Sequence, residues 1–142
     1  AHIDDLGASA AYWVASQASS VYANTGTALV GSIGTFLVAV DTSEAAAKEG
    51  VKVHVFRTGP LKGAGVSGSP ITEEQAANWQ ALVDAQQAEF DAAVKSGRGL
   101  SAAELAAVRT GEAFTARAAQ EKKLIDGIRS LESTLAALIQ AT

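Results

Sequence analysis

The sequence predicts an α/β fold with parallel strand pairing and a helical C-terminal extension. Three observations support this class. Strand-type and helix-type segments alternate in the first half of the chain, an order typical of parallel sheets. Capping motifs and helical periodicity indicate that helices dominate the second half. The 142 residues, 48% of them apolar, have the size and composition of a single domain with a hydrophobic core.

Helical and extended segments follow one another over the first half of the chain. The largely apolar residues 10–19 predict a short buried helix. Residues 41–49 have a polar start, an alanine-rich middle and Gly50 beyond their end, which is typical of another short helix. Strands are predicted where apolar and β-branched residues gather between turns, at residues 20–24, at residues 29–40 with an interrupting turn at 31–34, and at residues 51–56.

Loop and capping signals organise the second half. Residues 57–70 contain both prolines and several glycines, so they predict a loop. The Thr-Glu-Glu-Gln sequence at 72–75 is a capping box that opens a long helix to about residue 95. Further elements are predicted as a helix at 101–109 behind a second capping box, a helix at 115–121 capped by Thr115, a brief strand or turn at 124–126, and a helix at 130–140.

Composition and charge exclude several classes of function. The net charge is −4 and the charged residues are interspersed, so no basic face for nucleic acid is expected. The chain has no cysteine, and His2 and His54 lie far apart, so we expect no metal, no cofactor and no histidine-based triad. The longest uncharged apolar run, residues 28–40, is too short to span a bilayer.

Ser9 stands among small residues where the first predicted helix begins. Gly7 and Ala8 before it allow a tight turn. A serine here most commonly caps the helix, its oxygen accepting an N–H of the first turn. The same position also brings a hydroxyl close to free backbone N–H groups, which would stabilise an oxyanion. Helix cap and catalytic nucleophile are therefore both open roles for Ser9.

A nucleophilic serine needs a base, and Lys62 is the best candidate for one. No histidine suits the role on sequence grounds, which leaves a lysine in its neutral form. Burial favours the neutral amine because the charged form loses solvation. Lys62 lies in a glycine-rich loop just after the strand predicted at 51–56, where backbone can pack closely. The commoner role for a loop lysine is a solvated surface charge.

Three short motifs together resemble a known family. Gly-Ala-Ser-Ala-Ala-Tyr-Trp at 7–13, Val-Gly-Ser-Ile-Gly at 30–34 and Phe-Arg-Thr-Gly-Pro-Leu-Lys-Gly at 56–63 are similar, in order and spacing, to landmarks of the signal peptide peptidase A family. Residues 111–126 resemble the tail of that family. The resemblance covers almost the whole chain. It implies a Ser–Lys serine peptidase with the Clp-protease/crotonase-like fold of stacked βα units.

The resemblance implies a role for each matching residue. Ser9 would be the nucleophile, and Lys62 the general base that then protonates the leaving amine. Ser32 matches an accessory serine that orients the lysine, although a plain turn residue between two glycines is an equally good reading of Ser32 alone. The backbone N–H of Ala10 would be one oxyanion donor.

The sequence also departs from the family pattern. Many members have Gly-Gly where this chain has Ala10 and Ala11, whose methyl groups narrow the approach to the serine. The family's second oxyanion donor and its first strands lie upstream of the nucleophile, and the chain has no methionine. We therefore expect residues 1–142 to be the C-terminal portion of a Ser–Lys peptidase domain, with an incomplete oxyanion site when alone.

The resemblance predicts function only at the level of reaction class. The leading hypothesis is an endopeptidase acting on signal-peptide remnants or membrane-associated peptides, assembled as a homo-oligomeric ring and reaching the bacterial membrane through an N-terminal segment missing here. The alternatives are a phage-type protease that matures scaffold and capsid in the prohead, and a non-catalytic assembly protein of the same fold. A crotonase-type acyl-CoA enzyme on this architecture is a further class, but it would not need the serine and lysine.

Overall fold

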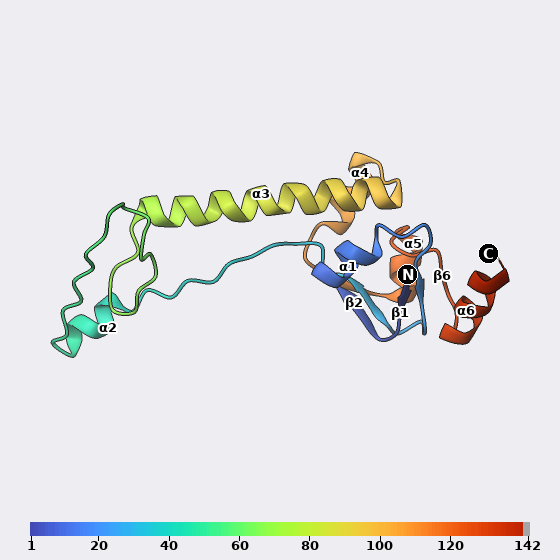
Figure 1. Cartoon of the computed structure of the whole chain (residues 1–142), viewed down its shortest axis with the longest axis horizontal. Helices are drawn as coiled ribbons and strands as arrows, with labels where there is room; N and C mark the ends of the chain where they lie inside the picture. The colour runs from blue at the N-terminus through green and yellow to red at the C-terminus, as the bar shows by residue number, and fades with distance from the viewer. Residues whose placement is uncertain (141–142) are drawn as a thin grey trace. The chain divides into compact units, whose positions relative to one another are not determined.

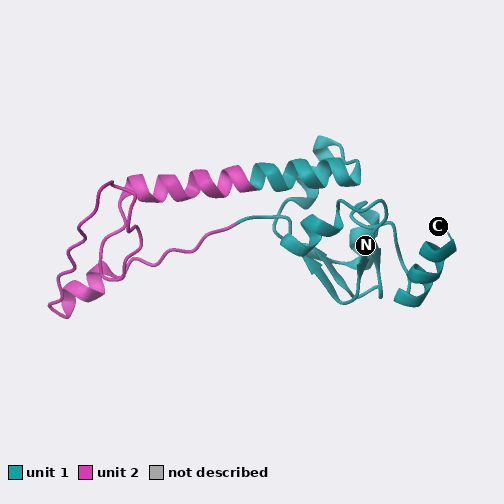
Figure 2. Cartoon of the chain, viewed as in Figure 1, with its two compact units in different colours: residues 1–35, 87–142 teal, residues 36–86 magenta. Residues whose placement is uncertain are grey.

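The computed structural model describes residues 1–140, which fall into two compact units (Figure 2). Unit 1 comprises Ala1–Thr35 and the chain from Gln87 onward, and unit 2 comprises Phe36–Gln86. Six helices and two small sheets form in the described residues (Figure 1). The predicted α/β class is confirmed, whereas the prediction of a single domain over 1–142 stays a prediction.

Both sheets belong to unit 1 and each has three strands. The first sheet has the order β1-β3-β6, with parallel pairing throughout; its strands are β1 (His2–Ile3), β3 (Tyr22–Ala23) and β6 (Gly127–Ile128). The second sheet has the order β2-β4-β5; its strands are β2 (Leu6–Ala8), β4 (Leu29–Gly31) and β5 (Ala113–Thr115). Here β2 and β4 are parallel, while β4 and β5 are antiparallel. Parallel pairing, as predicted, therefore holds for every strand pair except the last.

The predicted helices form, with adjusted ends. The helices are α1 (Ala10–Ala15), α2 (Ser43–Lys48), α3 (Glu73–Arg98), α4 (Ala102–Val108), α5 (Ala116–Glu121) and α6 (Leu131–Gln140). Helix α1 is shorter than the predicted 10–19, because the Ser16 hydroxyl donates to the carbonyl of Trp13 at 2.8 Å and the chain turns there. None of the helices within residues 1–140 combines the length and apolar character that crossing a membrane requires.

Local caps fix where several helices begin. At α3, the Gln75 N–H donates to Thr72 Oγ1 and the Thr72 N–H donates to Gln75 Oε1, both at 3.2 Å, so the predicted capping box is confirmed. At α4, Ser101 and Glu104 form the second predicted box. Hydrogen bonds from Lys123 and from Ser101 to the Glu104 carboxylate lower its pKa from 4.5 to about 2.

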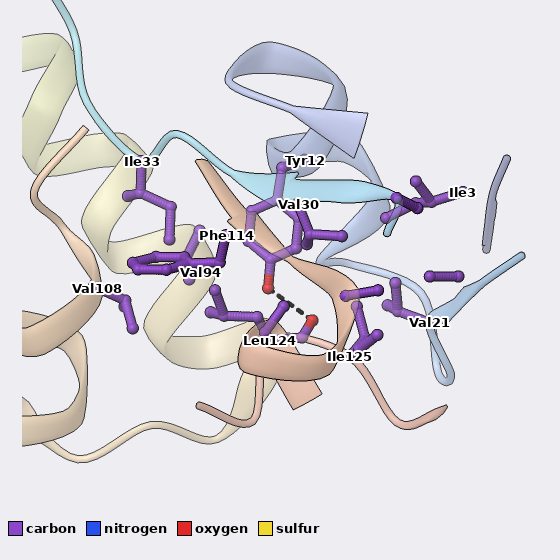
Figure 3. Packing of buried hydrophobic residues seen from close by; sticks show 14 of the residues in the cluster. Ile3, Tyr12, Val21, Val30, Ile33, Val94, Val108, Phe114, Leu124 and Ile125 are labelled. Carbon is purple, nitrogen blue, oxygen red and sulfur yellow. Dashed lines mark hydrogen bonds between the residues drawn. The ribbon is translucent and has the colours of Figure 1, made fainter. Parts of the chain in front are cut away.

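The hydrophobic core of unit 1 surrounds Tyr12 (Figure 3). Tyr12 is fully buried, and its hydroxyl donates to the carbonyl of Leu124 at 2.8 Å. Burial raises the pKa of this hydroxyl, so it stays a neutral donor. Beside it, the rings of Trp13 and Phe90 stack with centroids 4.7 Å apart, which ties α1 to α3. Two contacts therefore hold α1 in the core: the hydrogen bond from Tyr12 to Leu124 and the stacking of Trp13 on Phe90.

Two predicted strands are wrong in whole or in part. Residues 51–56 are extended but form no strand, and the segment predicted at 29–40 is a strand only as far as Gly31. Alternating β-branched side chains favour a strand, but a strand also needs a neighbouring strand with which its backbone can form hydrogen bonds. Within the described residues, neither the part of the first segment after Gly34 nor residues 51–56 pair with another strand, and Phe36 and Phe56 are left 86% and 96% exposed.

Candidate active site

Ser9 lies on a sharp turn between β2 and α1, in unit 1. Its φ of 54° and ψ of −127° fall where a residue with a side chain is strained by about 1–3 kcal/mol. The backbone is pinned on both sides of the turn. The Ser9 N–H donates to the carbonyl of Gly31 at 2.8 Å, and the Ser9 carbonyl accepts from the Trp13 N–H at 2.9 Å. Parallel pairing of β2 with β4 therefore imposes the strained conformation.

This geometry tests one of the two roles left open for Ser9, that of helix cap. Its side chain is exposed and, over residues 1–140, makes no capping hydrogen bond to α1. The commoner helix-cap role is therefore wrong. A strained strand-to-helix turn that projects an exposed hydroxyl is how many hydrolases present a nucleophilic serine. Strain of this kind is concentrated at functional sites, since folding alone would favour glycine there.

The residues on either side of Ser9 fit the same arrangement. Ala10 is the first residue of α1, where an N–H has no acceptor within its own helix. Within residues 1–140 this N–H has no acceptor, so it can donate to an oxyanion formed next to the Ser9 hydroxyl. Gly7 is buried under the turn, and a Cβ added there would lie 2.6 Å from the Ile3 side chain. The turn can approach β1 this closely only because residue 7 is glycine.

Ser32 occupies the equivalent position on the next strand. The register pairs Ala8 with Gly31, so Ser9 and Ser32 follow directly after neighbouring parallel strands. Ser32 also has a positive φ, 50°, and its N–H donates to the carbonyl of Glu112 at 2.8 Å. Its side chain is half-buried. The structure thus places Ser9 and Ser32 next to one another at the carboxyl ends of β2 and β4.

Lys62 lies in unit 2, in the loop that precedes α3. Its N–H donates to the carbonyl of Gly59 at 3.1 Å, and its side chain is exposed. The carbonyl of Pro60, two residues earlier, accepts from Gln75 Nε2 at 2.9 Å and from Arg57 Nη1 at 3.1 Å. Because Lys62 and Ser9 belong to different units, their approach to one another stays a prediction.

Two residues that hold the segments carrying Ser9 and Lys62 were not singled out for this from the sequence. The hydroxyl of Tyr12 anchors the helix behind Ser9, but its acceptor lies 112 residues away along the chain and no local pattern reveals it. Gln75 was identified as a capping residue only, because its second contact crosses to the loop of Lys62. In the described part of the chain, no three histidine or acidic side chains gather into a group that could bind a metal ion.

Comparison with known proteins identifies the family. The family model described as peptidase family S49 matches residues 1–142. The chain belongs to peptidase family S49. The resemblance to signal peptide peptidase A enzymes is therefore confirmed, and membership of S49 implies a serine peptidase. A search of curated proteins found no match.

Proposed function

We propose that this S49 chain carries the nucleophile and the general base of a Ser–Lys endopeptidase. The observation that carries the proposal is the strained Ser9 turn, which exposes a hydroxyl beside the free Ala10 N–H in a chain of a peptidase family. The proposal assigns Ser9 as nucleophile and Lys62 as base. Ser32, which follows β4 as Ser9 follows β2, orients the lysine by accepting from or donating to its neutral amine.

Each step of peptide hydrolysis then has a residue to perform it. The Ser9 Oγ attacks the scissile carbonyl carbon while the neutral Lys62 amine takes the hydroxyl proton. The Ala10 N–H stabilises the oxyanion of the tetrahedral intermediate. When the C–N bond breaks, the Lys62 ammonium returns its proton to the leaving amine. Water, deprotonated by the same amine, hydrolyses the acyl-enzyme and restores Ser9.

The wider assignments belong to the same proposal. We assign the Clp-protease/crotonase-like fold, which the parallel βα arrangement of β2, α1 and β4 supports. A homo-oligomeric ring would supply neighbours to the unpaired extended segments that expose Phe36 and Phe56. Lys62 then meets Ser9 within one chain or across a subunit boundary. The proposed substrates are signal-peptide remnants or membrane-associated peptides, with phage-type scaffold cleavage as the alternative.

A covalent probe tests the proposal directly. The intact, assembled protein is treated with an alkyl fluorophosphonate, which phosphonylates activated serines, and the modified residue is mapped by mass spectrometry. Ser9 is expected to be the modified residue, and Ser9→Ala to abolish labelling. Ser19→Ala, which removes another exposed serine of unit 1, is the matched control and should label like the wild type. Labelling that persists in Ser9→Ala would refute Ser9 as the nucleophile.

A further inference from the structure

We infer that Gln75 is a positioning residue for the reaction, because its side-chain amide holds the loop that carries Lys62. The inference rests on the proposed role of Lys62 as the base. Gln75 is one of only two polar residues that are buried in the described chain, at 2% exposure. Its amide lies between the start of α3 and the loop at 57–70, all within unit 2.

The oxygen and the nitrogen of the Gln75 amide bind different partners. Gln75 Oε1 accepts from the Thr72 N–H at 3.2 Å, which completes the cap of α3. Gln75 Nε2 donates to the carbonyl of Pro60 at 2.9 Å, which is not part of any capping motif. A glutamate would serve the cap equally well, since acidic residues are common at this position of a capping box. Unlike a glutamate carboxylate, which only accepts, the amide can accept from the cap and also donate to the loop.

The held carbonyl lies very close to the lysine in the chain. Lys62 follows Pro60 by two positions, with Leu61 between them, so their Cα atoms are at most about 7 Å apart. Exposed Arg57 also donates to this carbonyl, at 3.1 Å, but an exposed side chain constrains the loop less than a buried one. The loop is further limited at Gly65, where an added Cβ would lie 3.3 Å from the Trp79 ring. The base is thus carried on a loop fixed to the first turns of α3.

Fixing the loop matters because proton transfer needs hydrogen-bond reach between base and nucleophile. A displacement of about 1 Å at a reacting group can reduce a rate about 100-fold. Without the Nε2 donor, Lys62 would sample positions from which it cannot take the Ser9 proton. Loss of the Nε2 donor should therefore lower the rate of the chemical step and leave the binding of substrate or probe unchanged.

Two substitutions separate the loop contact from the cap. Gln75→Glu keeps the acceptor for the Thr72 N–H but removes the donor to the Pro60 carbonyl. Thr72→Ala removes the hydroxyl that caps α3 but leaves the Nε2 contact in place. The intact protein is treated with the alkyl fluorophosphonate at a series of concentrations. The maximal rate of Ser9 labelling and the concentration giving half that rate are measured for each variant, together with the melting temperature.

The inference predicts opposite outcomes for the two variants. Gln75→Glu should lower the maximal labelling rate about 10- to 100-fold, with the half-saturating concentration unchanged. Thr72→Ala should lower the melting temperature and leave the labelling rate within about two-fold of the wild type. Should Gln75→Glu fail to fold, Gln75→Met is compared with Thr72→Ala, and the excess loss of rate measures the loop contact.

Lys62→Ala distinguishes failure of this inference from failure of the proposed function. Wild-type labelling by Gln75→Glu, with labelling lost in Lys62→Ala, would overturn the inference alone. An equal loss of rate in Thr72→Ala and Gln75→Glu would also overturn it, because the cap would then explain both. Wild-type labelling by Lys62→Ala would overturn the proposed role of the lysine itself.

Discussion

Replacing Ser9 by glycine should stabilise unit 1 relative to replacing it by alanine. Alanine keeps the strained backbone at φ 54°, ψ −127°, whereas glycine adopts it without a Cβ penalty. The strain is worth about 1–3 kcal/mol. Glycine loses about 0.5–1 kcal/mol of this through the larger entropy of its unfolded chain. The Gly variant should therefore exceed the Ala variant in free energy of unfolding by about 1 kcal/mol at the middle of these ranges, and by at most about 2.5 kcal/mol.

Urea denaturation followed by tryptophan fluorescence measures this difference. Trp13 stacks on Phe90 in unit 1, so a Trp79→Phe background leaves only the tryptophan next to the turn. Ala11→Gly is the matched control, because Ala11 is an exposed residue of α1 with ordinary helical geometry. It should lower the free energy of unfolding by about 1 kcal/mol. A Ser9→Gly variant no more stable than Ser9→Ala would refute the claim that strain is held at this serine.

Three further predictions concern what supports the site. Tyr12→Phe should lower the free energy of unfolding by about 1–3 kcal/mol in urea denaturation, because the Leu124 carbonyl loses its buried donor; no change would mean that water replaces the hydroxyl. Gly7→Ala should cost about 1–3 kcal/mol in the same assay, because the new methyl group overlaps Ile3, and an unchanged midpoint would show that the side chain yields freely. Glu104 has a lowered pKa, so the stability it contributes is complete above about pH 4.5 and is lost as pH falls toward 2. Glu104→Gln should reduce the fall in free energy of unfolding between about pH 4.5 and 2 in an acid-unfolding curve. A curve identical to the wild type would contradict a stabilising role of the ionised Glu104.

Helices with local caps could be predicted from the sequence. The capping boxes that open α3 and α4, and the Thr115 cap of α5, use contacts three residues apart and form as predicted. Strands depend on partners elsewhere in the chain. Residues 51–56 have the alternation of a strand, but within the described residues no segment pairs with them. The sequence pattern alone therefore predicted a strand in unit 2 that does not form.

The sequence supplied the candidate site residues, which stay a prediction, but not their geometry. Small residues around Ser9 indicated a turn, the lack of a suitable histidine pointed to Lys62 as a base, and the resemblance supplied the role of Ser32. The positive φ of Ser9 depends on the register of β2 with β4, which no single segment encodes. The contact from Gln75 to Pro60 depends on how the loop returns to α3, so no local sequence pattern predicts it either.

The most direct test of the account is the pH dependence of Ser9 labelling in the intact protein and in Lys62→Arg. A lysine base acts only when neutral, so the wild-type labelling rate should rise with pH to a plateau. Arginine keeps a similar length and a positive charge but stays protonated at every usable pH, so Lys62→Arg should remain slow throughout. Near wild-type labelling by Lys62→Arg, with the same rise, would contradict the Ser–Lys dyad and direct the search for a base to His54.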